Sequence, residues 1–311
     1  MQPQLLPQGS SLLLAVSGGQ DSMALLALLQ DLTPLHGWSL SLWHGDHRWH
    51  ENSSRIATEL SNWCQQRQLP LKVDQAAPGQ VPSENKARQW RYERLTQRGR
   101  QAGADVVTGH TASDRAETML LQLARGSDLA GLAVLPSVRP LSPEGPLLRR
   151  PLLHLQRHDT LQICRKLALP IWEDPSNQSP EFARNRIRME VLPVLEALHP
   201  GSTQRMSDLA ERVSQVRDSQ TELSRMTLKL LETAAGLDRR GLGALSSASR
   251  RLLLAQWLQQ QGVPALPASQ LGELSRRLKS GAPGGAADLA GGWQLSWKGA
   301  ELVLQQRAAE H

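Results

Sequence analysis

Short apolar runs alternate with longer amphipathic segments through the first 110 residues of the chain. Runs of four or five apolar residues have the length of buried strands, and the segments between them have the length of helices. This alternation predicts an α/β fold, with a doubly wound, mostly parallel sheet that carries helices on both faces. The predicted strands are 12–16, 40–43 and 104–108, and the predicted helices are 23–29, 53–68 and 83–102.

The second half of the chain changes to a long helical pattern followed by a small mixed unit. Apolar positions at three- and four-residue spacing predict a helix from Ser202 to about Thr233, which Gly236 ends. Two shorter helices and a closing hairpin then predict a small α+β domain. Residues 133–150 hold five prolines or glycines and are predicted to form a loop. We therefore expect three parts, with bounds 1–201, 202–235 and 236–311.

A glycine-rich segment joins the first predicted strand to the first helix. Two glycines let the backbone approach an anion, and the free N–H groups at the helix start point toward it. The chain has no GxxxxGK[ST] motif, so this is not the lysine-containing phosphate loop. An ordinary glycine-rich turn is the alternative. The residues expected to hold phosphate are Ser17, Gly18, Gly19, Gln20, Asp21 and Ser22.

Polar clusters also follow the other two predicted strands, and carboxyl ends of parallel strands meet at one edge of a sheet. His44 and Asp46 end the second strand, and His110 follows the third. Asp114 and Glu117 are three residues apart on one helical face, as two Mg²⁺ ligands beside a nucleotide would be. Two alternatives stay open at this point. Asp114 could simply stabilise the helix N-terminus, and His44, Asp46, His47 and His50 could bind a metal.

Arginine dominates the basic residues of this chain. It has 29 arginines and six lysines, a net charge of +6 and a pI near 9.9, which suits a polyanionic partner. Arg184 and Arg188 share one face of a predicted helix, where they could clamp a phosphate or carboxylate; a solvated charged face is the alternative. The cationic candidates are Arg88, Arg91, Arg125, Arg184, Arg186 and Arg188.

With these motifs in this order, the chain resembles the tRNA(Ile)-lysidine synthetase family, a group of ATP pyrophosphatases with an adenine-nucleotide α-hydrolase-like fold. The resemblance is continuous over the first two hundred residues and looser beyond them. Its most specific part is the run Glu173–Asn177 followed by Arg184–Arg188. The other matching pieces are Ser17–Ser22, His44–His47, 87–92, 109–118, 123–126, 131–132 and 150–153.

The resemblance implies a ligase that forms a C–N bond in two steps. ATP, with Mg²⁺, adenylates the wobble cytidine of a tRNA(Ile) with a CAU anticodon, and the amine of free L-lysine then displaces AMP. Asp21, Asp114 and Glu117 are the implied catalytic residues, with their separate roles undetermined. Residues 1–201 would be the catalytic domain and 236–311 a tRNA-binding domain. A cytoplasmic protein without membrane contact is expected, and a homodimer is compatible with the sequence.

The chain departs from the family pattern at two places in the predicted site. Gly45 stands where the family usually has valine, and Ser113 stands where it commonly has a second acid beside Asp114. Two other functions must also be weighed. A tRNA thiolase of the same fold would need paired cysteines, whereas Cys64 and Cys164 are single and far apart. A basic RNA-binding protein with a vestigial nucleotide loop would not bind ATP.

Overall fold

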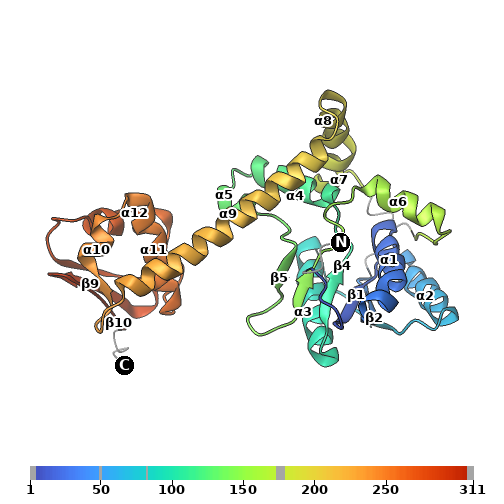
Figure 1. Cartoon of the computed structure of the whole chain (residues 1–311), viewed down its shortest axis with the longest axis horizontal. Helices are drawn as coiled ribbons and strands as arrows, with labels where there is room; N and C mark the ends of the chain where they lie inside the picture. Colours follow the sequence, from blue (N-terminus) through green and yellow to red (C-terminus); the bar gives the residue numbers. More distant parts are fainter. Residues whose placement is uncertain (1–4, 49–50, 82, 173–178, 307–311) are drawn as a thin grey trace. The chain divides into compact units, whose positions relative to one another are not determined.

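The first half of the chain forms a six-stranded sheet whose strands run in the order β3-β2-β1-β4-β6-β5 (Figure 1). The computed structural model describes all residues except 1–4, 49–50, 82, 173–178 and 307–311. All neighbouring pairs in this sheet are parallel except β5 with β6. The strand order reverses direction between β1 and β4, which is where ligands bind in sheets of this class. The strands are β1 Ser11–Ala15, β2 Ser39–Asp46, β3 Leu71–Gln75, β4 Asp105–Thr108, β5 Val138–Pro140 and β6 Leu147–Arg149.

Alternate residues of the central strand β1 pack into two separate cores. Leu12 and Leu14 lie in a core with residues of α1 and α2, while Leu13 lies on the other side with residues of α3. This two-sided burial explains why β1 is apolar throughout, and it confirms the prediction of a sheet with helices on both faces. The helices of this part are α1 Gln20–His36, α2 Glu51–Gln66, α3 Glu84–Ala102, α4 Ala112–Ala124, α5 Leu129–Leu132 and α6 Arg157–Lys166.

The prediction of a loop over 133–150 was wrong, because this segment supplies β5 and β6. Both strands have only three residues, and β5 ends in a proline, so neither shows an alternating apolar pattern. Pro140 is tolerated because β5 lies at the edge of the sheet. The third strand β3 was also not predicted, since its sequence LKVDQ is half polar.

The chain then returns to the site through a short irregular helix. Helix α7 (Ala183–Arg186) continues directly into a π-helical turn, η2 (Ile187–Val191), and then into α8 (Leu192–Leu198). Turns with π geometry are rare and occur often at functional sites. Here the turn contains Arg188, and Arg184 lies in α7 directly before it; both are among the predicted cationic residues.

Helix α9 extends over Ser202–Leu231, two residues short of its predicted end. The described chain divides into two compact units, Met1–Gln215 and Val216–His311, and this division lies inside α9. The N-terminal part of α9 packs on α4 through Met119, Ala210 and Met206. Arg115 of α4 is only 2% exposed and pairs with Glu211 of α9 at 2.8 Å. The first unit therefore includes part of the helix predicted as a linker.

The second unit is a small α+β domain. Its antiparallel sheet has the order β7-β10-β9-β8, and β9 with β10 forms the predicted hairpin. Leu254, Trp297 and Leu302 are among its core residues. No helix among the described residues is long and apolar enough to cross a membrane. The elements are β7 Leu237–Asp238, α10 Arg239–Ala244, α11 Ser247–Gln260, α12 Ala268–Arg277, β8 Gly285–Asp288, β9 Trp293–Lys298 and β10 Glu301–Gln306.

Candidate active site

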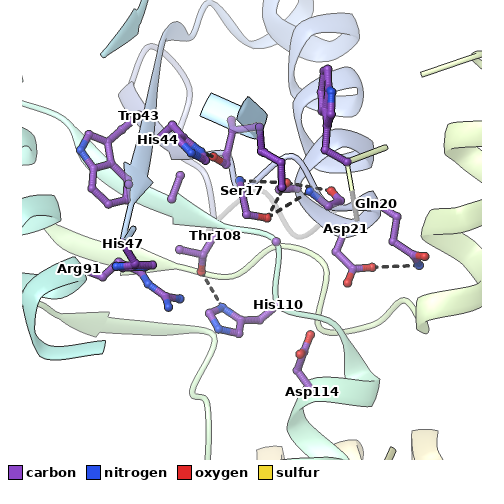
Figure 2. Close-up of a pocket in the computed structure, with 18 of the residues that line it drawn as sticks. Ser17, Gln20, Asp21, Trp43, His44, His47, Arg91, Thr108, His110 and Asp114 are labelled. Carbon is purple, nitrogen blue, oxygen red and sulfur yellow. Dashed lines mark hydrogen bonds between the residues drawn. The ribbon is translucent and has the colours of Figure 1, made fainter. Parts of the chain in front are cut away.

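The three predicted polar clusters meet in one pocket at the carboxyl ends of β1, β2 and β4 (Figure 2). The predicted residues that line it are Ser17, Gly19, Gln20, Asp21, Ser22, His44, Asp46, Arg91, His110, Asp114, Arg184 and Arg188. The convergence expected from strand order therefore occurs.

The loop between β1 and α1 has the geometry of an anion site. Gly18 has φ +86°, a left-handed conformation that favours glycine, and a Cβ there would lie 3.3 Å from the Trp172 ring. Ser17 and Ser22 close the loop, because the Ser17 N–H donates to Ser22 Oγ at 3.2 Å. Gly19 is the N-cap of α1 and offers no side chain to its first turn. The amides there are thus free of a side-chain cap, as binding phosphate requires.

Gly109 brings the end of β4 against this loop. A Cβ at Gly109 would lie 2.9 Å from the backbone carbonyl of Asp21, so only glycine permits this approach. His110 follows and forms a hydrogen bond with Thr108 Oγ1 at 2.8 Å. Burial, reinforced by nearby arginines, lowers the pKa of His110 well below its usual value. This imidazole is consequently neutral near pH 7.

His44 and Asp46 form the wall contributed by β2. His44 Nδ1 donates to the Val16 carbonyl at 2.8 Å, and burial lowers the pKa of this imidazole. Asp46 accepts hydrogen bonds from the Arg48 N–H at 2.9 Å and from Ser54 Oγ at 3.2 Å. His44 thus connects β2 to the residue before the phosphate loop, and Asp46 connects the end of β2 to α2.

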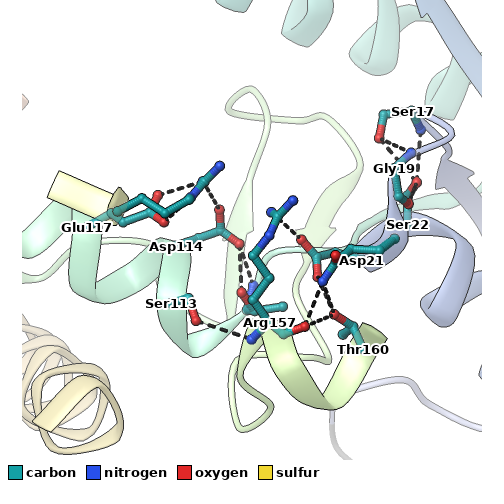
Figure 3. A network of polar contacts seen from close by, with 12 residues as sticks. Ser17, Gly19, Asp21, Ser22, Ser113, Asp114, Glu117, Arg157 and Thr160 are labelled. Carbon is teal, nitrogen blue, oxygen red and sulfur yellow. Dashed lines mark hydrogen bonds and ion pairs between the residues drawn. The ribbon is translucent and has the colours of Figure 1, made fainter. Parts of the chain in front are cut away.

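Asp21 is held by a helix from far along the sequence. It pairs with Arg157 at 3.1 Å and accepts a hydrogen bond from Thr160, both on α6 (Figure 3). Gln20 also binds α6, donating to the Arg157 carbonyl at 2.6 Å. Burial raises the pKa of Asp21, and the negative charge of Asp114 raises it further. Asp21 is therefore a more basic carboxylate than an exposed aspartate.

Asp114 and Glu117 anchor two arginines, Arg184 of α7 and Arg188 of η2. Arg184 donates to Asp114 Oδ1 and to Glu117 Oε2, each at 2.7 Å. Arg188 donates to both oxygens of Glu117, at 2.6 and 2.9 Å. Burial raises the pKa of Asp114, but the charges of Arg184 and Arg188, the neighbouring His110 and the hydrogen bond from the Thr111 N–H together outweigh this effect and hold that pKa below its usual value. The result is a charged network that fixes two cations beside the nucleotide pocket.

The predicted assignment of Mg²⁺ to Asp114 and Glu117 stays a prediction. Glu117 is fully buried and does not line the pocket, and its oxygens accept from Arg184 and Arg188. Asp21 and Asp114 both line the pocket and interact electrostatically. Within the part of the chain that the structure describes, no group of three His, Cys, Asp or Glu residues is arranged to hold a metal.

The remaining predicted residues lie in different surroundings. Gly18 is part of the loop but does not line the pocket, and Arg88 stacks over Tyr92 with its Cζ 5.1 Å from the ring centroid. Arg125 is exposed at the end of α4, and Arg186 pairs on the surface with Glu190 at 3.0 Å. His50 and the run 173–177 lie outside the described residues.

Both departures from the family pattern have a structural explanation. A Cβ at Gly45 would lie 2.5 Å from the Trp43 ring and 3.1 Å from the Trp90 ring, so these tryptophans occupy the space of a larger side chain. Ser113 Oγ accepts a hydrogen bond from the Arg157 N–H at 3.2 Å and so joins α4 to α6. A serine here connects the two helices that carry Asp114 and the partners of Asp21.

Sequence reasoning missed the contribution of α6. Arg157 and Thr160 lie more than 130 residues from Asp21 in the chain, and no motif marks them. Trp172, Phe182 and Tyr92 also line the pocket and were not singled out as site residues. Their shared signal is that they are aromatic residues in or beside segments already assigned to the site.

Comparison with known proteins identifies both parts of the chain. Residues 2–195 match the model of a PP-loop domain, and residues 237–308 match that of the TilS substrate binding domain. The tRNA(Ile)-lysidine synthase of Parasynechococcus marenigrum is 64% identical over 99% of this chain and 93% of its own length. The chain belongs to the tRNA(Ile)-lysidine synthase family. The synthase of Prochlorococcus marinus strain SARG is 43% identical, over 96% of this chain and 91% of its own.

A solved structure of a protein from outside the tRNA(Ile)-lysidine synthase family has a similar fold. The U34-tRNA thiolase NcsA from Methanococcus maripaludis, solved with its [4Fe-4S] cluster, matches with a TM-score of 0.58 and 17% identity. The match covers 68% of this chain and 74% of that one. The thiolase alternative is not favoured, because Cys64 and Cys164 are both buried and free, and burial raises the pKa of Cys64 to about 11.

Proposed function

We propose that this chain attaches L-lysine to the wobble cytidine of tRNA(Ile) with a CAU anticodon, as an ATP-dependent ligase. One observation supports the proposal above the others. A phosphate-binding loop and a fixed array of carboxylates and arginines line the same pocket, so ATP and a charged amino acid could be held together. The similarity to full-length relatives named tRNA(Ile)-lysidine synthase supports the same reaction.

In the first step, the cytidine would take AMP from ATP and pyrophosphate would leave. The backbone N–H groups of Ser17–Ser22 would hold the phosphates as negative charge moves onto pyrophosphate. Mg²⁺ bound to ATP takes most of its ligands from phosphate and water and needs one or two carboxylates. Asp21 and Asp114 fit that need, since both line the pocket and lie close enough to interact.

In the second step, the lysine amine would displace AMP, and it must lose a proton to do so. Asp21 suits proton removal, because burial and the neighbouring Asp114 raise its pKa. Asp114 suits binding of a cation, because the charge of Arg184 and its other polar contacts together overcome the effect of burial and keep its pKa low. Arg184 and Arg188 would face the carboxylate of lysine or a phosphate. The reaction suits a cytoplasmic enzyme, where tRNA, ATP and free lysine occur together.

The test is incorporation of labelled lysine into tRNA. Purified protein, ATP and Mg²⁺ are incubated with an unmodified tRNA(Ile) transcript that carries CAU, and with elongator tRNA(Met) as the competing substrate. We expect acid-precipitable label on the first tRNA only. Asp21→Ala should abolish it, whereas Asp31→Asn, an exposed acid on the same helix, should not.

Two negative results would each refute the lysine ligase. Pyrophosphate release without lysine incorporation would keep the ATP pyrophosphatase chemistry and refute the lysine ligase. Binding of RNA without any ATP binding would instead favour a vestigial nucleotide loop.

A further inference from the structure

A group of arginines around Tyr92 lacks the carboxylate partners that other arginines of the first unit possess. Arg115, Arg149, Arg157, Arg184 and Arg188 all form ion pairs. Within the described ranges, no ion pair is formed by the four arginines near Tyr92. We name this group the Tyr92 cluster; its members are Tyr92, Arg88, Arg91, Arg139 and Arg150.

Tyr92, the single tyrosine of the chain, holds this cluster together. The Cζ atoms of Arg88 and Arg139 lie 5.1 and 4.9 Å from the centroid of its ring, within cation–π distance. Burial raises the pKa of Tyr92, but the charges of Arg88, Arg150 and Arg139 outweigh it and lower that pKa. The cluster therefore carries a strong positive potential.

Arg150 is the buried member and is incompletely satisfied. Its side chain is 1% exposed, and Nη1 donates to the Pro136 carbonyl at 2.6 Å. Its Nε is buried and has no hydrogen-bond partner. Tyr92 also forms a hydrogen bond with Arg150 and favours its charged form. Arg150 is therefore a buried cation without a carboxylate partner, and its charge adds to the positive potential that an anion bound at the surface of the cluster would meet.

The Tyr92 cluster adjoins the nucleotide pocket but lies away from the phosphate loop. Arg91 and Tyr92, both on α3, line the pocket. Figure 2 shows Arg91 beside His47, across the pocket from Gln20 and Asp21. Arg139 is on β5 and Arg150 follows β6, and β6 is two strands away from β1 in the sheet. Two strand spacings are ~10 Å, farther than neighbouring phosphates of one triphosphate lie from each other.

We propose that the Tyr92 cluster binds a backbone phosphodiester of the RNA substrate next to the nucleotide whose base enters the pocket. The inference rests on the proposed function, because it assumes that RNA is the substrate. The loop Ser17–Ser22 already provides the amides that ATP phosphates need, so the second cationic site is left for a second phosphate-bearing substrate. Arg88 and Arg91 were candidates for tRNA contact from sequence; the structure adds Arg139, Arg150 and Tyr92.

The experiment measures how RNA affinity depends on salt. The full chain is titrated with the unmodified tRNA(Ile) transcript across a range of salt concentrations, and ATP affinity is measured separately by equilibrium dialysis. Arg139→Gln should weaken RNA binding by about tenfold at fixed salt. It should also reduce the magnitude of the negative slope of log K against log salt by about 0.7 to 0.9, the value for one lost phosphate contact. The affinity for ATP should not change.

Two further variants separate binding from structural effects. Arg94→Gln is the matched control, because Arg94 is on α3 beside the Tyr92 cluster but is not a member of it and donates to Gln97 at 3.1 Å. The slope of this variant should equal that of the parent protein. Arg150→Met removes the buried charge and should weaken RNA binding while the melting temperature stays equal or rises. If Arg150 served only to stabilise the fold, its replacement by methionine would lower the melting temperature instead.

Three outcomes test the proposed phosphate site and separate it from the proposed ligase function. An Arg139→Gln slope equal to that of the Arg94→Gln control overturns the phosphate site. A loss of ATP affinity with unchanged RNA affinity assigns the cluster to nucleotide phosphates and overturns the RNA assignment. If the parent protein incorporates no lysine but the salt slope still falls in Arg139→Gln, the phosphate site stands and the proposed ligase function fails.

Discussion

Replacing Glu117 with glutamine separates two roles for this buried carboxylate. Glu117 is fully buried and accepts three charge-assisted hydrogen bonds of 2.6 to 2.9 Å from Arg184 and Arg188. Glutamine keeps the shape, but it removes the charge and turns one amide N–H₂ toward a guanidinium. The variant therefore leaves two partly buried cations short of a counter-charge.

The cost can be estimated from the contacts that remain. Removing one partner of a buried ion pair costs ~3–5 kcal/mol. Arg184 keeps its 2.7 Å bond to Asp114, and both arginine side chains are 21–25% exposed, so the low end applies. A loss of about 3 kcal/mol corresponds to a fall in melting temperature of roughly 6–12 °C for a unit of this size.

The assay combines thermal melting with lysine incorporation at several Mg²⁺ concentrations. If Glu117 positions the arginines, Glu117→Gln should lower the melting temperature and the activity, and extra Mg²⁺ should not restore the activity. Glu190→Gln is the matched control, because Glu190 pairs with Arg186 at 3.0 Å but both side chains are at least 50% exposed. Its expected cost is below about 1 kcal/mol. An unchanged melting temperature together with rescue by Mg²⁺ would refute the positioning role and favour a metal ligand.

Three further outcomes follow from other contacts. Because burial lowers the pKa of His110 to about 3, the unfolded chain binds the proton more readily below pH 6.5. The free energy of unfolding should thus fall as pH drops from 6.5 toward 3, and His110→Gln should flatten this dependence in urea titrations at pH 7 and 5. Gly109→Ala should raise the KM for ATP more than tenfold, because its Cβ would displace the start of α1, and an unchanged KM would contradict this packing. A fragment ending at residue 201 deprives Arg115 of its partner on α9 and should melt well below one ending at 215; equal melting temperatures would show that α9 adds nothing to the first unit.

The sequence predicted the parts of the site that depend on local pattern. A buried strand, two glycines and an apolar helix follow one another in the sequence and define the phosphate loop, and parallel strands bring His110 to the same edge. The division into 1–201, 202–235 and 236–311 stays a prediction, since α9 continues through the boundary between the two compact units.

The contacts that were missed depend on tertiary structure. Arg157 reaches Asp21 only because α6 packs on α1, and nothing in the local sequence of α6 indicates that. The pairing of Glu117 with two arginines was also hidden, since a spacing of three on a helix suits metal binding and ion pairing equally. Strands β5 and β6 were not predicted from the sequence, because three residues are too few to display an alternating pattern.

The contact of Gly45 with two tryptophan rings has a consequence for how this site can change over evolutionary time. Trp43 and Trp90 fill the volume that a side chain at position 45 would need, and Trp43 is also fixed by its 2.8 Å hydrogen bond to Asp74. The three positions therefore constitute one epistatic unit. Valine at 45 is accessible only after a smaller residue replaces Trp43, and a tryptophan at 43 is tolerated only on a background that already has glycine. The order in which such substitutions occur is thus restricted by packing alone, in a strand whose final residues form a wall of the nucleotide pocket.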